Sequence, residues 1–432
     1  MPINLPETGQ KRVVIVGAGF AGLTLARKLV GSGYQIVLID RNNYHQFQPL
    51  FYQVAMAGLE PSSISFPLRK MFRKTPQMYI RLADVQSVDV GQKRLFSNAG
   101  HVNYDILILA MGVTTNYYGN QELANRVFSL KSVSDALYLR NAILSDFEKS
   151  LMVRDYQKRQ GYLDIAIVGG GPTGVELAGA LAEMRKYILP REYTELDSKE
   201  VDIYLIEGSP RVLNGMSEKS SKAAERFLRG LGVQVKLDVR VTDYDGTTLM
   251  LSDGSTVLSK KVIWAAGITG FSLKGIPDES TGPGRRLKVD QYNTLTTSSD
   301  IYVIGDIAYM EEGEYKGHPQ VAQVAMQQAK HLAKNLKRQQ SGKQMLPFHY
   351  RDLGTLATIG RNKAVADLPV VRFQGFWAWV LWLIVHLKSI LGIKNKLFVM
   401  LNWVWGYITY DQSLRIIIRP KSQPGQENTD IR

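Results

Sequence analysis

The stretch KRVVIVGAGFAGLTLARKL, residues 11–29, decides the fold, because a β-branched strand leads into Gly17-x-Gly19-x-x-Gly22 and then into an apolar-periodic helix. In such a unit the first glycine permits a tight turn, the second lets the backbone approach a pyrophosphate, and the third lets the helix pack on the strand. The N-terminus of the helix offers unpaired N–H groups and a positive dipole end to the phosphates. The stretch therefore predicts a dinucleotide-binding unit.

The stretch LDIAIVGGGPTGVELAGAL, residues 163–181, repeats this design with Gly169-x-Gly171-x-x-Gly174. Pro172 suits the start of its helix, where no backbone N–H is needed. A lone glycine pattern is a weak signal, since glycine-rich turns are common, but both copies here follow a strand and open a helix. The chain is therefore predicted to be an α/β protein with two Rossmann-like dinucleotide-binding domains.

Each such unit needs an acidic residue at the end of its second strand to accept hydrogen bonds from the ribose hydroxyls. Asp40 lies 23 residues after Gly17, close to the usual spacing, whereas Glu207 lies 38 residues after Gly169. The polar insertion RKYILPREYTELDSKE accounts for the longer gap. An acid at Glu207 disfavours the 2′-phosphate of NADP, so NADH is the expected substrate, although Arg211 nearby keeps NADPH open.

The two halves also share a second pattern downstream of their glycine motifs. RLFSNAGHVNYDILILAMG (94–112) and LMLSDGSTVLSKKVIWAAG (249–267) each predict a hairpin with glycine at its turn and then an apolar strand. Gly112 and Gly267 close the two units. Two related nucleotide-binding halves in one chain favour two dinucleotides held face to face, which for chemistry means NAD(P)H donating hydride to FAD.

A third segment, SSDIYVIGDIA, ends a strand at Gly305-Asp306, and a helix is predicted to begin near Pro319. In a two-dinucleotide flavoprotein this Asp hydrogen-bonds the ribityl chain of the flavin, and the helix N-terminus faces the flavin edge where negative charge develops on reduction. The simpler interpretation of Asp306 is a turn or cap residue. The expected domains are an FAD-binding domain in two parts, 1–118 and 285–345, an NADH-binding domain, 119–284, and a C-terminal membrane-anchoring or dimerisation region, 346–432.

Composition narrows the class of protein. The 432 residues include no cysteine, which excludes disulfides, thiolate nucleophiles, cysteine-ligated zinc and iron–sulfur clusters. The six histidines have no metal-ligand spacing, so no metal is expected. The net charge is +14, but scattered Lys and Arg without a recognisable binding motif do not favour nucleic acid as a partner. The N-terminus has no signal-peptide pattern, so the protein is expected to start and stay in the cytoplasm.

With these residues identified, the chain resembles the type II NADH dehydrogenases, single-subunit NADH:quinone oxidoreductases that do not pump protons, within the pyridine nucleotide-disulfide oxidoreductase superfamily. The resemblance runs nearly end to end. Its further motifs are NYHQFQPLFYQVAMAGLEP (43–61), GGGPTGVELAG, VIGDIA, AQVAMQ (322–327), GTLATIGRNKAVAD and the closing AWVLWLIVHL…NWVWGYIT. The glycine motifs belong to the whole flavoprotein superfamily, whereas the tail motifs are much more specific.

The resemblance implies a role for each matching residue. FAD would be held by Gly17, Ala18, Gly19, Phe20, Ala21, Gly22, Asp40, Arg41, Val85, Ala110, Gly112, Gly305, Asp306, Ala322 and Gln323, with the Val85 backbone meeting the adenine. NADH would be held by Gly169, Gly171, Thr173, Gly174, Glu176, Glu207, Ala266 and Gly267. In the family the glutamate at Glu176 is tied to NADH positioning and proton movement, and its simpler interpretation is a partner of the helix dipole. Gln323 and Gln327 are the candidates for the quinone end.

One position departs from the family. Many relatives carry Lys before the glycine of x-Gly-x-x-Ala-x-x-Gly, where it can approach the flavin or quinone, and this chain has Leu353 there. A lysine-assisted quinone step is therefore not carried over to this chain.

The C-terminal segment GFWAWVLWLIVHLKSILGIKNKLFVMLNWVWGY, residues 375–407, contains five of the six tryptophans. Its first apolar run, taken as a helix of about 13 residues, is roughly 20 Å long, short of the roughly 30 Å hydrocarbon core. Lys394-Asn395-Lys396 then interrupts before the second run. From Arg372 to Lys421 there is one acid, Asp411, and there are seven basic residues: Arg372, Lys388, Lys394, Lys396, Arg415, Arg419 and Lys421.

Tryptophans and lysines at the ends of apolar runs suit a lipid interface. The first interpretation is a helical hairpin that lies in one leaflet at the cytoplasmic face of the cell membrane, where it meets a quinone (ubiquinone or menaquinone) that stays in lipid. A homodimer interface or an intramolecular core is the second, and a membrane-spanning hairpin is the third. The first two can coexist.

Two other functions remain open. A soluble NAD(P)H-dependent ferredoxin- or rubredoxin-type reductase would need no membrane tail. A flavin-binding redox sensor that docks at membranes would bind FAD and NADH but turn over negligibly with any quinone. Disulfide reductases and sulfide:quinone oxidoreductases of this fold need redox cysteines, and the absence of cysteine excludes both.

Overall fold

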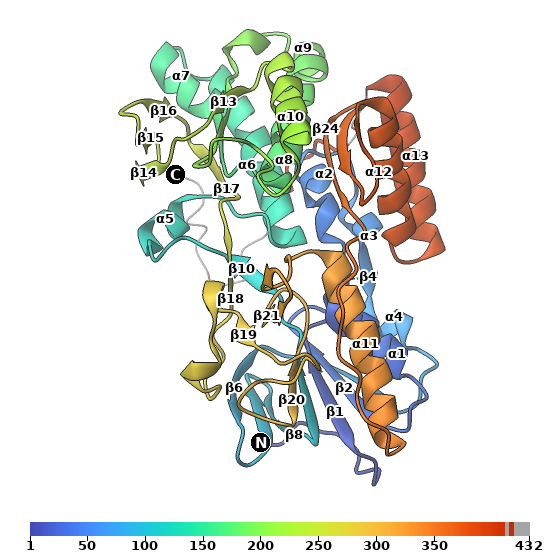
Figure 1. Cartoon of the computed structure of the whole chain (residues 1–432). Coiled ribbons are helices and arrows are strands. Elements are labelled where there is room, and N and C mark those ends of the chain that lie inside the picture. The colour runs from blue at the N-terminus through green and yellow to red at the C-terminus, as the bar shows by residue number, and fades with distance from the viewer. Residues whose placement is uncertain (411–413, 419–432) are drawn as a thin grey trace. The chain divides into compact units, whose positions relative to one another are not determined.

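In the computed structural model the described residues are 1–410 and 414–418, and the chain forms two units that alternate along the sequence. Unit 1 comprises Met1–Gln46, Ser65–Asn116 and Gly267–Gly354, and unit 2 comprises Phe47–Ile64, Tyr117–Ala266 and Thr355–Arg432. Figure 1 labels the elements of both units along the chain. Asp411, Arg419 and Lys421, counted in the charge of the tail, lie outside the described residues.

Unit 1 is built on a parallel sheet of five strands, which are in spatial order β20 (Ile301–Val303), β9 (Ile106–Leu109), β1 (Arg12–Val16), β2 (Gln35–Asp40) and β5 (Met78–Leu82). The register of β1 pairs Val14 with Val37 on one side and with Leu107 on the other. Four of the five residues of β1 are buried, as expected for a β-branched central strand that is covered on both faces.

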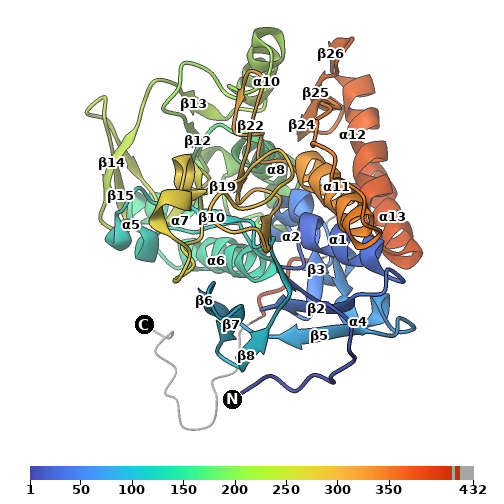
Figure 2. The same ribbon diagram turned by 60° about the horizontal axis from the view of Figure 1, so that its bottom comes forward.

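Two long helices of unit 1, α1 (Phe20–Leu29) and α11 (Ala322–Gln340), pack on each other and lie side by side in Figures 1 and 2. Helix α11 begins at Ala322 rather than near Pro319, because Val321 at its N-cap is still extended (φ −132°, ψ 151°). The other strands and the short α-helix of unit 1 are β3 (Tyr44–Gln46), β4 (Ser65–Pro67), α4 (Leu68–Met71), β6 (Val85–Asp89), β7 (Arg94–Ser97), β8 (Gly100–Asn103), β10 (Val113–Thr115), β18 (Ile268–Gly270), β19 (Leu287–Lys288), β21 (Ala308–Tyr309), β22 (Glu311–Glu312) and β23 (Tyr315–Lys316).

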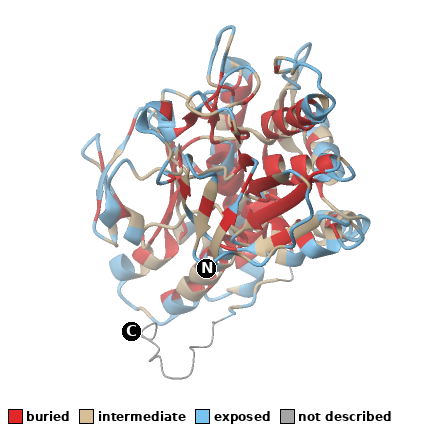
Figure 3. Ribbon diagram, turned by 90° about the horizontal axis from the view of Figure 1, so that it is seen from below, coloured by how far each residue is buried: buried red, intermediate tan, exposed pale blue. Residues whose placement is uncertain are grey.

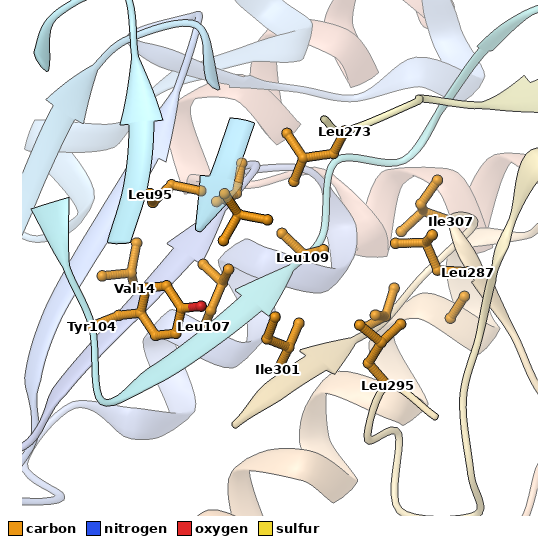
Figure 4. Packing of buried hydrophobic residues seen from close by; sticks show 14 of the residues in the cluster. Val14, Leu95, Tyr104, Leu107, Leu109, Leu273, Leu287, Leu295, Ile301 and Ile307 are labelled. Carbon is orange, nitrogen blue, oxygen red and sulfur yellow. The ribbon is translucent and has the colours of Figure 1, made fainter. Parts of the chain in front are cut away.

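The core of unit 1 gathers side chains from strands that are far apart in the sequence. Leu107 and Ile301, paired in register on β9 and β20, are both fully buried, and Figure 4 shows them beside Leu109 and Leu295. Each fully buried side chain of this kind stabilises the fold by about 1.5–3 kcal/mol relative to exposure. The core therefore joins the segment around Gly305 to the first strands of the chain.

Unit 2 repeats this plan with a parallel sheet in the order β13 (Gln234–Lys236), β12 (Ile203–Ile206), β11 (Ile165–Val168) and β17 (Lys261–Trp264). Its small antiparallel sheet is β14 (Val241–Tyr244), β15 (Thr248–Leu251) and β16 (Thr256–Leu258), as β6–β8 is in unit 1. Its helices are α2 (Phe51–Ala55), α3 (Pro61–Ile64), α5 (Gln121–Arg126), α6 (Val133–Leu151), α7 (Tyr156–Leu163), α8 (Pro172–Tyr187), α9 (Leu189–Glu192) and α10 (Glu218–Gly230). Figure 3 shows the strands mainly buried and many loops exposed.

The C-terminal part of unit 2 packs directly on helix α8. Its antiparallel sheet is β24 (Thr355–Gly360), β25 (Lys363–Asp367) and β26 (Arg372–Gln374). A Cβ at Gly179 would lie 1.8 Å from the carbonyl oxygen of Ile359, so α8 and β24 touch through their backbones and only glycine fits there. The tail is thus part of the same unit as the second glycine motif.

The tail itself is a pair of neighbouring helices, α12 (Phe376–Ser389) and α13 (Ile393–Thr409), seen side by side in Figures 1 and 2. Lys394–Lys396, which separate the two apolar runs in the sequence, lie in the first turn of α13. The break comes earlier, at Ile390–Gly392, where Gly392 has φ +82°. Within the described residues, no helix is long and apolar enough to cross a bilayer.

The repeated hairpin-and-strand plan is confirmed: β7, β8 and β9 in unit 1 correspond to β15, β16 and β17 in unit 2. The long gap before Glu207 is filled by the end of α8, by α9 and by a short 3₁₀ turn at Ser198–Glu200. The unit boundaries differ from the expected domains at residues 267–284, which group with unit 1 because β18 pairs with β10. Residues 47–64 and the tail group with unit 2.

Candidate functional site

The first glycine motif forms a tight cradle between β1 and α1. Gly17 has φ +99°, and a Cβ there would lie 2.4 Å from the carbonyl oxygen of Ala110. A Cβ at Gly22 would lie 1.9 Å from the carbonyl oxygen of Gly17. Both positions therefore require glycine, one for the turn and one for the contact of helix with strand.

The middle glycine of this cradle has a different environment. A Cβ at Gly19 would meet nothing within 4 Å, and no side chain caps the N-terminus of α1. Open space in front of uncapped helix N–H groups fits the pyrophosphate of a dinucleotide. The cradle thus has the shape that its sequence predicts.

Asp40, at the end of β2, closes the cradle. Its Oδ2 accepts a hydrogen bond from the Ala18 backbone N–H at 2.6 Å, and its Oδ1 accepts one from the Asn42 N–H at 2.7 Å. Burial raises the pKa of Asp40, and the two backbone hydrogen bonds act in the opposite direction. His45, which the sequence did not single out, is buried against the same turn, with Nδ1 2.9 Å from the Ala18 carbonyl oxygen.

The second glycine motif repeats this geometry in unit 2. Gly169 has φ +111°, a Cβ at Gly174 would lie 1.9 Å from the Gly169 carbonyl oxygen, and a Cβ at Gly171 would again meet nothing within 4 Å. Glu207 Oε2 accepts a hydrogen bond from the Gly170 N–H at 2.5 Å, the equivalent of the bond from Ala18 to Asp40. The open space at Gly171 and the acid at Glu207 therefore fit a second dinucleotide, as Gly19 and Asp40 do in the first cradle.

Arg211, which left room for NADPH, is engaged with a neighbour. Its Nε donates to Asn214 Oδ1 at 2.9 Å, and its terminal nitrogen donates to the Asn214 carbonyl oxygen at 3.1 Å. Glu207 Oε1 accepts from the Ser209 N–H at 2.7 Å, so both carboxylate oxygens of Glu207 already have backbone partners. This arrangement favours a ribose hydroxyl over a 2′-phosphate beside Glu207.

The other residues expected at FAD all lie in unit 1. Ala110 and Gly112 follow β9, Val85 begins β6, and Arg41 pairs with Asp84 at 3.3 Å. Gly305 has φ +77°, and a Cβ there would lie 3.1 Å from the Ala21 side chain. Phe20, Ala21 and Ala322 lie in the first turns of α1 and α11, and Asp306, directly after Gly305, is partly exposed.

The residues expected at NADH are divided between the units. Thr173 lies exposed in the first turn of α8, and Ala266 ends the part of unit 2 that contains β17. Gly267, expected beside Ala266, belongs to unit 1, where its carbonyl oxygen accepts a hydrogen bond from the Asn116 N–H at 3.2 Å.

Gln323 and Gln327, the candidates for the quinone end, both hold the chain segment Arg351–Gly354. Gln323 Nε2 donates to the Gly354 carbonyl oxygen at 3.1 Å, and its Oε1 accepts from the Leu353 N–H at 3.0 Å. Gln327 exchanges a similar pair of hydrogen bonds with the backbone of Arg351. Leu353 itself is exposed, so the position where many relatives carry Lys presents an apolar side chain to its surroundings.

Glu176 is the fifth residue of α8 and points away from solvent, toward the C-terminal part of unit 2. Its Oε1 accepts hydrogen bonds from the Thr358 N–H at 3.3 Å and from the Trp382 indole N–H at 3.2 Å. Burial raises the pKa of Glu176 to about 8, although both hydrogen bonds lower it. Glu176 therefore carries its proton at neutral pH.

A cavity of about 170 Å³ lies beside Glu176, entirely within unit 2. Its polar lining includes Tyr52, Gln53, Glu183 and Arg361. The Gln53 amide donates to the Tyr52 hydroxyl at 2.8 Å and accepts from the Trp403 indole N–H at 2.8 Å. Burial raises the pKa of Tyr52 well above its usual value, and the charges of Glu176 and Glu183 add to this effect. The cavity is large enough for several water molecules, and its lining offers them hydrogen-bond partners.

Comparison with known proteins decides the family. Residues 11–329 match the family described as pyridine nucleotide-disulphide oxidoreductase, and residues 353–409 match the NDH2 C-terminal domain. Over 418 residues the chain is 36% identical to the type II NADH:quinone oxidoreductase Ndh of Mycobacterium tuberculosis, covering 92% of this chain and 88% of the relative. The chain belongs to the type II NADH dehydrogenase family. The expected family and the α/β fold with two Rossmann-like domains are thereby confirmed.

A second relative and a solved structure extend the comparison. A second M. tuberculosis enzyme, the type II NADH:quinone oxidoreductase NdhA, is 33% identical over 412 residues, covering 91% of this chain and 87% of the relative. The structure of NDH2 from Plasmodium falciparum in complex with NADH has a TM-score of 0.87 at 21% identity, covering 95% of this chain and all of that chain. This structural likeness extends through the C-terminal region but, at such low identity, concerns the fold alone.

Sequence reasoning missed the side chains that surround Glu176. Trp382 was assigned to the tail, and Tyr52 and Gln53 lie in the short helix α2, whose sequence has no polar spacing of its own. Trp382 is 206 residues away from Glu176. Trp382 is buried, whereas Trp377 and Ile384 of the same helix are exposed. The sequence does not distinguish Trp382 from these neighbours, so it gave no signal of the contact with Glu176.

Proposed function

We propose that this family member uses FAD to oxidise NADH and to reduce a membrane quinone by two electrons, without pumping protons. One observation carries the proposal: both glycine cradles have the same acid-to-backbone hydrogen bond and the same open middle glycine, in a chain that matches the family nearly end to end. The overall reaction is NADH + H⁺ + quinone → NAD⁺ + quinol, so it consumes one proton besides the hydride.

The two cradles would bind the two dinucleotides. In unit 1, Gly19 leaves room for the FAD pyrophosphate and Asp40 accepts from a ribose hydroxyl; in unit 2, Gly171 and Glu207 do the same for NADH. FAD, when bound, supplies an acceptor for hydride and a donor of two electrons. The protein's part is to hold the two dinucleotides in position and to manage protons.

Glu176 is the residue that we assign to proton handling. Its buried carboxyl is protonated near neutral pH, and its two hydrogen-bond donors fix the orientation of Oε1. A carboxyl with a pKa near the working pH can give up and regain a proton readily. Quinone reduction requires such a proton source.

Gln323 and Gln327 would act at the quinone end through the segment that they hold. Their amides fix the backbone of Arg351–Gly354 and thereby the exposed side chain of Leu353. An apolar side chain at this position suits contact with the ring of a quinone, and it offers no proton. The proton must therefore come from another group.

The tail would place the enzyme on the cytoplasmic face of the membrane. Helices α12 and α13 expose a set of large apolar side chains, here called the apolar foot: Phe376, Trp377, Ile384, Val385, Ile393, Leu397, Phe398, Met400, Leu401, Val404, Trp405 and Ile408. Many large apolar side chains exposed on two neighbouring helices favour a membrane or protein contact. Lys388, Lys394 and Lys396 beside it suit an anionic lipid surface. A homodimer formed through the same helices stays a prediction.

The decisive test uses the purified full-length protein. We expect a yellow protein that oxidises NADH much faster than NADPH with a quinone, and that floats with lipid vesicles. Bound flavin with negligible quinone reduction would instead support a redox sensor. Reduction of a ferredoxin, without vesicle binding or lipid-quinone activity, would support a soluble reductase.

The membrane contact has a matched pair of variants. Leu401→Glu with Val404→Glu puts two charges into the apolar foot and should abolish vesicle flotation while FAD content is unchanged. Met152→Glu with Met250→Glu adds the same charge at two exposed apolar residues outside the foot and should leave flotation intact. Equal behaviour of the two pairs would remove the foot from the proposal.

A further inference from the structure

A second groove lies in unit 1, between the last turn of α1 and the C-terminal half of α11. It has a volume of about 470 Å³ and is lined by six basic side chains: Lys28, Lys330, Lys334, Lys337, Arg338 and Lys343. Its floor is Ala333, which is buried where the two helices pack together. The Tyr34 hydroxyl, just after α1, donates to the Leu336 carbonyl oxygen at 3.0 Å and fixes one helix against the other.

The groove is separate from the expected FAD site. Both helices begin at the cradle end of unit 1, where Ala21 and Ala325 meet on either side of Gly305. Lys330 lies five residues farther along α11, and the other basic residues of α11 lie beyond it. The groove therefore lies toward the ends of α1 and α11, away from the N-termini that are expected to face the flavin and its phosphates.

The two segments that form the groove contain no acidic residue. From Thr8 to Ile39 and from Tyr315 to Arg351 the sequence has no Asp or Glu. Within the described part of the chain, none of the six basic side chains forms an ion pair with a carboxylate. Among the residues that the structure describes, no carboxylate thus compensates the positive charge of the groove.

Another surface helix of the same chain shows the usual compensation. In α10, Lys222 pairs with Glu218 at 2.6 Å and Arg229 pairs with Glu225 at 2.8 Å, each at a spacing of four residues. Helix α11 instead places like charges at that spacing, with Lys330 before Lys334 and Lys334 before Arg338. Such like-charge pairs destabilise a helix. The basic groove is therefore not a general property of this basic chain.

The helix dipole explains only part of the charge. Lys28, Lys337 and Arg338 lie in the last turns of their helices, where cations compensate the negative dipole end. Lys330 and Lys334 lie one to two turns earlier, and the dipole effect falls off within the last turn. An external anion would offset the repulsion that remains.

We propose that this groove binds a phosphate-bearing anion. Lysine ammonium groups act as mobile point charges, which suits a phosphate that carries more than one charge or several phosphates in a row. The Arg338 Nε is occupied by the Gln344 carbonyl oxygen at 2.8 Å, so most of the attraction comes from the lysines. The phosphate has two possible sources, the head group of an anionic phospholipid and a free pyrophosphate or triphosphate.

The test compares two triple variants that remove the same charge. Lys330→Gln, Lys334→Gln and Lys337→Gln remove three of the six positive charges of the groove. The control Lys158→Gln, Lys199→Gln and Lys219→Gln removes three exposed lysines of unit 2. Full-length proteins are first matched for FAD content. Binding is then measured with vesicles of phosphatidylcholine alone or mixed with phosphatidylglycerol, and with inorganic pyrophosphate by calorimetry, at low and high salt.

We expect the groove variant to lose about fivefold in affinity per lysine near anionic lipid, on the order of 100-fold in all, and the control to change little. Loss of the preference for phosphatidylglycerol vesicles, without pyrophosphate binding in the parent protein, identifies lipid as the source. Loss of pyrophosphate binding, with no preference among vesicles, identifies free phosphate. Equal losses in the two variants, or no binding of either ligand by the parent, would overturn the proposal.

Discussion

Each of the two cradles has a hydrogen bond between an acid and a backbone N–H, but the two residues that form it differ between the cradles. In the first, Asp40 accepts from the N–H of Ala18; in the second, Glu207 accepts from the N–H of Gly170. Glutamate is longer by one methylene, and a Cβ at Gly170 would lie 2.9 Å from Glu207 Oε2. The acid and the residue after the first glycine therefore form a matched pair. The shorter acid, aspartate, is combined with alanine, and the longer acid, glutamate, is combined with glycine.

A second difference lies two residues after the last glycine of each motif. The first cradle has Thr24 there and the second has Glu176, whose carboxyl is buried against Thr358 and Trp382. Within the described residues, helix α1 packs on no sheet comparable to the C-terminal sheet that packs on α8. The second half therefore combines nucleotide binding with a buried proton, and the first half does not.

The largest expected effect comes from the third glycine of each cradle. Gly22→Val and Gly174→Val each place a side chain where even a Cβ would lie 1.9 Å from a backbone oxygen. If the first cradle holds FAD, Gly22→Val should yield colourless protein, measured as the ratio of flavin to protein absorbance. Gly174→Val should keep its flavin and lose NADH oxidation. Loss of flavin from both variants would contradict the assignment of one dinucleotide to each cradle.

The matched pair in the second cradle can be exchanged for that of the first. Gly170→Ala should raise the KM for NADH about tenfold, because the new Cβ displaces the Glu207 carboxylate. Adding Glu207→Asp should restore much of the loss, since it recreates the combination of Ala18 with Asp40. A double variant that is as poor as the sum of its single changes would show that the two positions are independent.

A smaller effect is expected from a change in the protonation of Glu176, measured as the pH profile of quinone reduction. The pKa of Glu176 is about 8, because burial raises it more than the hydrogen bonds from Thr358 and Trp382 lower it. Trp382→Phe removes one of these two bonds, so the pKa should rise further, to about 9. The alkaline limb of quinone reduction should move to higher pH by that amount. Phe373→Leu, in the same part of unit 2 but with no bond to Glu176, is the control. An unchanged profile would remove Glu176 from the proton step.

The same pKa has a consequence for stability. Because the folded protein holds the Glu176 proton more tightly than the unfolded chain, this stabilisation is complete below pH about 4.5 and is lost as the pH rises to about 8. Glu176→Gln should therefore flatten the decline of Tm over this range. A decline as steep as in the parent would place its origin elsewhere.

The smallest effect is expected at Arg211. Its guanidinium is bound to Asn214, so Arg211→Ala should leave the preference for NADH over NADPH within about twofold. Steady-state kinetics with both nucleotides measure this directly. A large gain in NADH preference would mean that Arg211 turns toward a 2′-phosphate in the second cradle.

The sequence predicts those parts of the fold and site that depend on short spacing. Gly17, Gly22 and Asp40 stand within one strand–turn–helix–strand unit, and each has the geometric role that its spacing indicates. The two parallel sheets follow from the same repeats. Glycine patterns are informative because a positive φ or a backbone contact excludes nearly every other residue.

Contacts between distant segments could not be predicted in this way. Trp382 and Trp403 suggested a lipid interface, yet their indole N–H groups donate to Glu176 and Gln53 inside unit 2. Gln323 and Gln327 were expected to face a quinone, and their amides hold the backbone near Leu353. A tryptophan or glutamine carries both apolar surface and a hydrogen-bonding group, and sequence alone does not say which of them a distant partner will use.

The alternation of the two units along the chain constrains how such a protein can change over evolutionary time. The backbone passes from one unit to the other five times, after Gln46, Ile64, Asn116, Ala266 and Gly354. A single crossover therefore cannot exchange one unit for that of a relative, because no single cut separates the two units. An exchange with a relative would need two crossovers, for example after Asn116 and after Ala266, which enclose the whole parallel sheet and the glycine motif of unit 2.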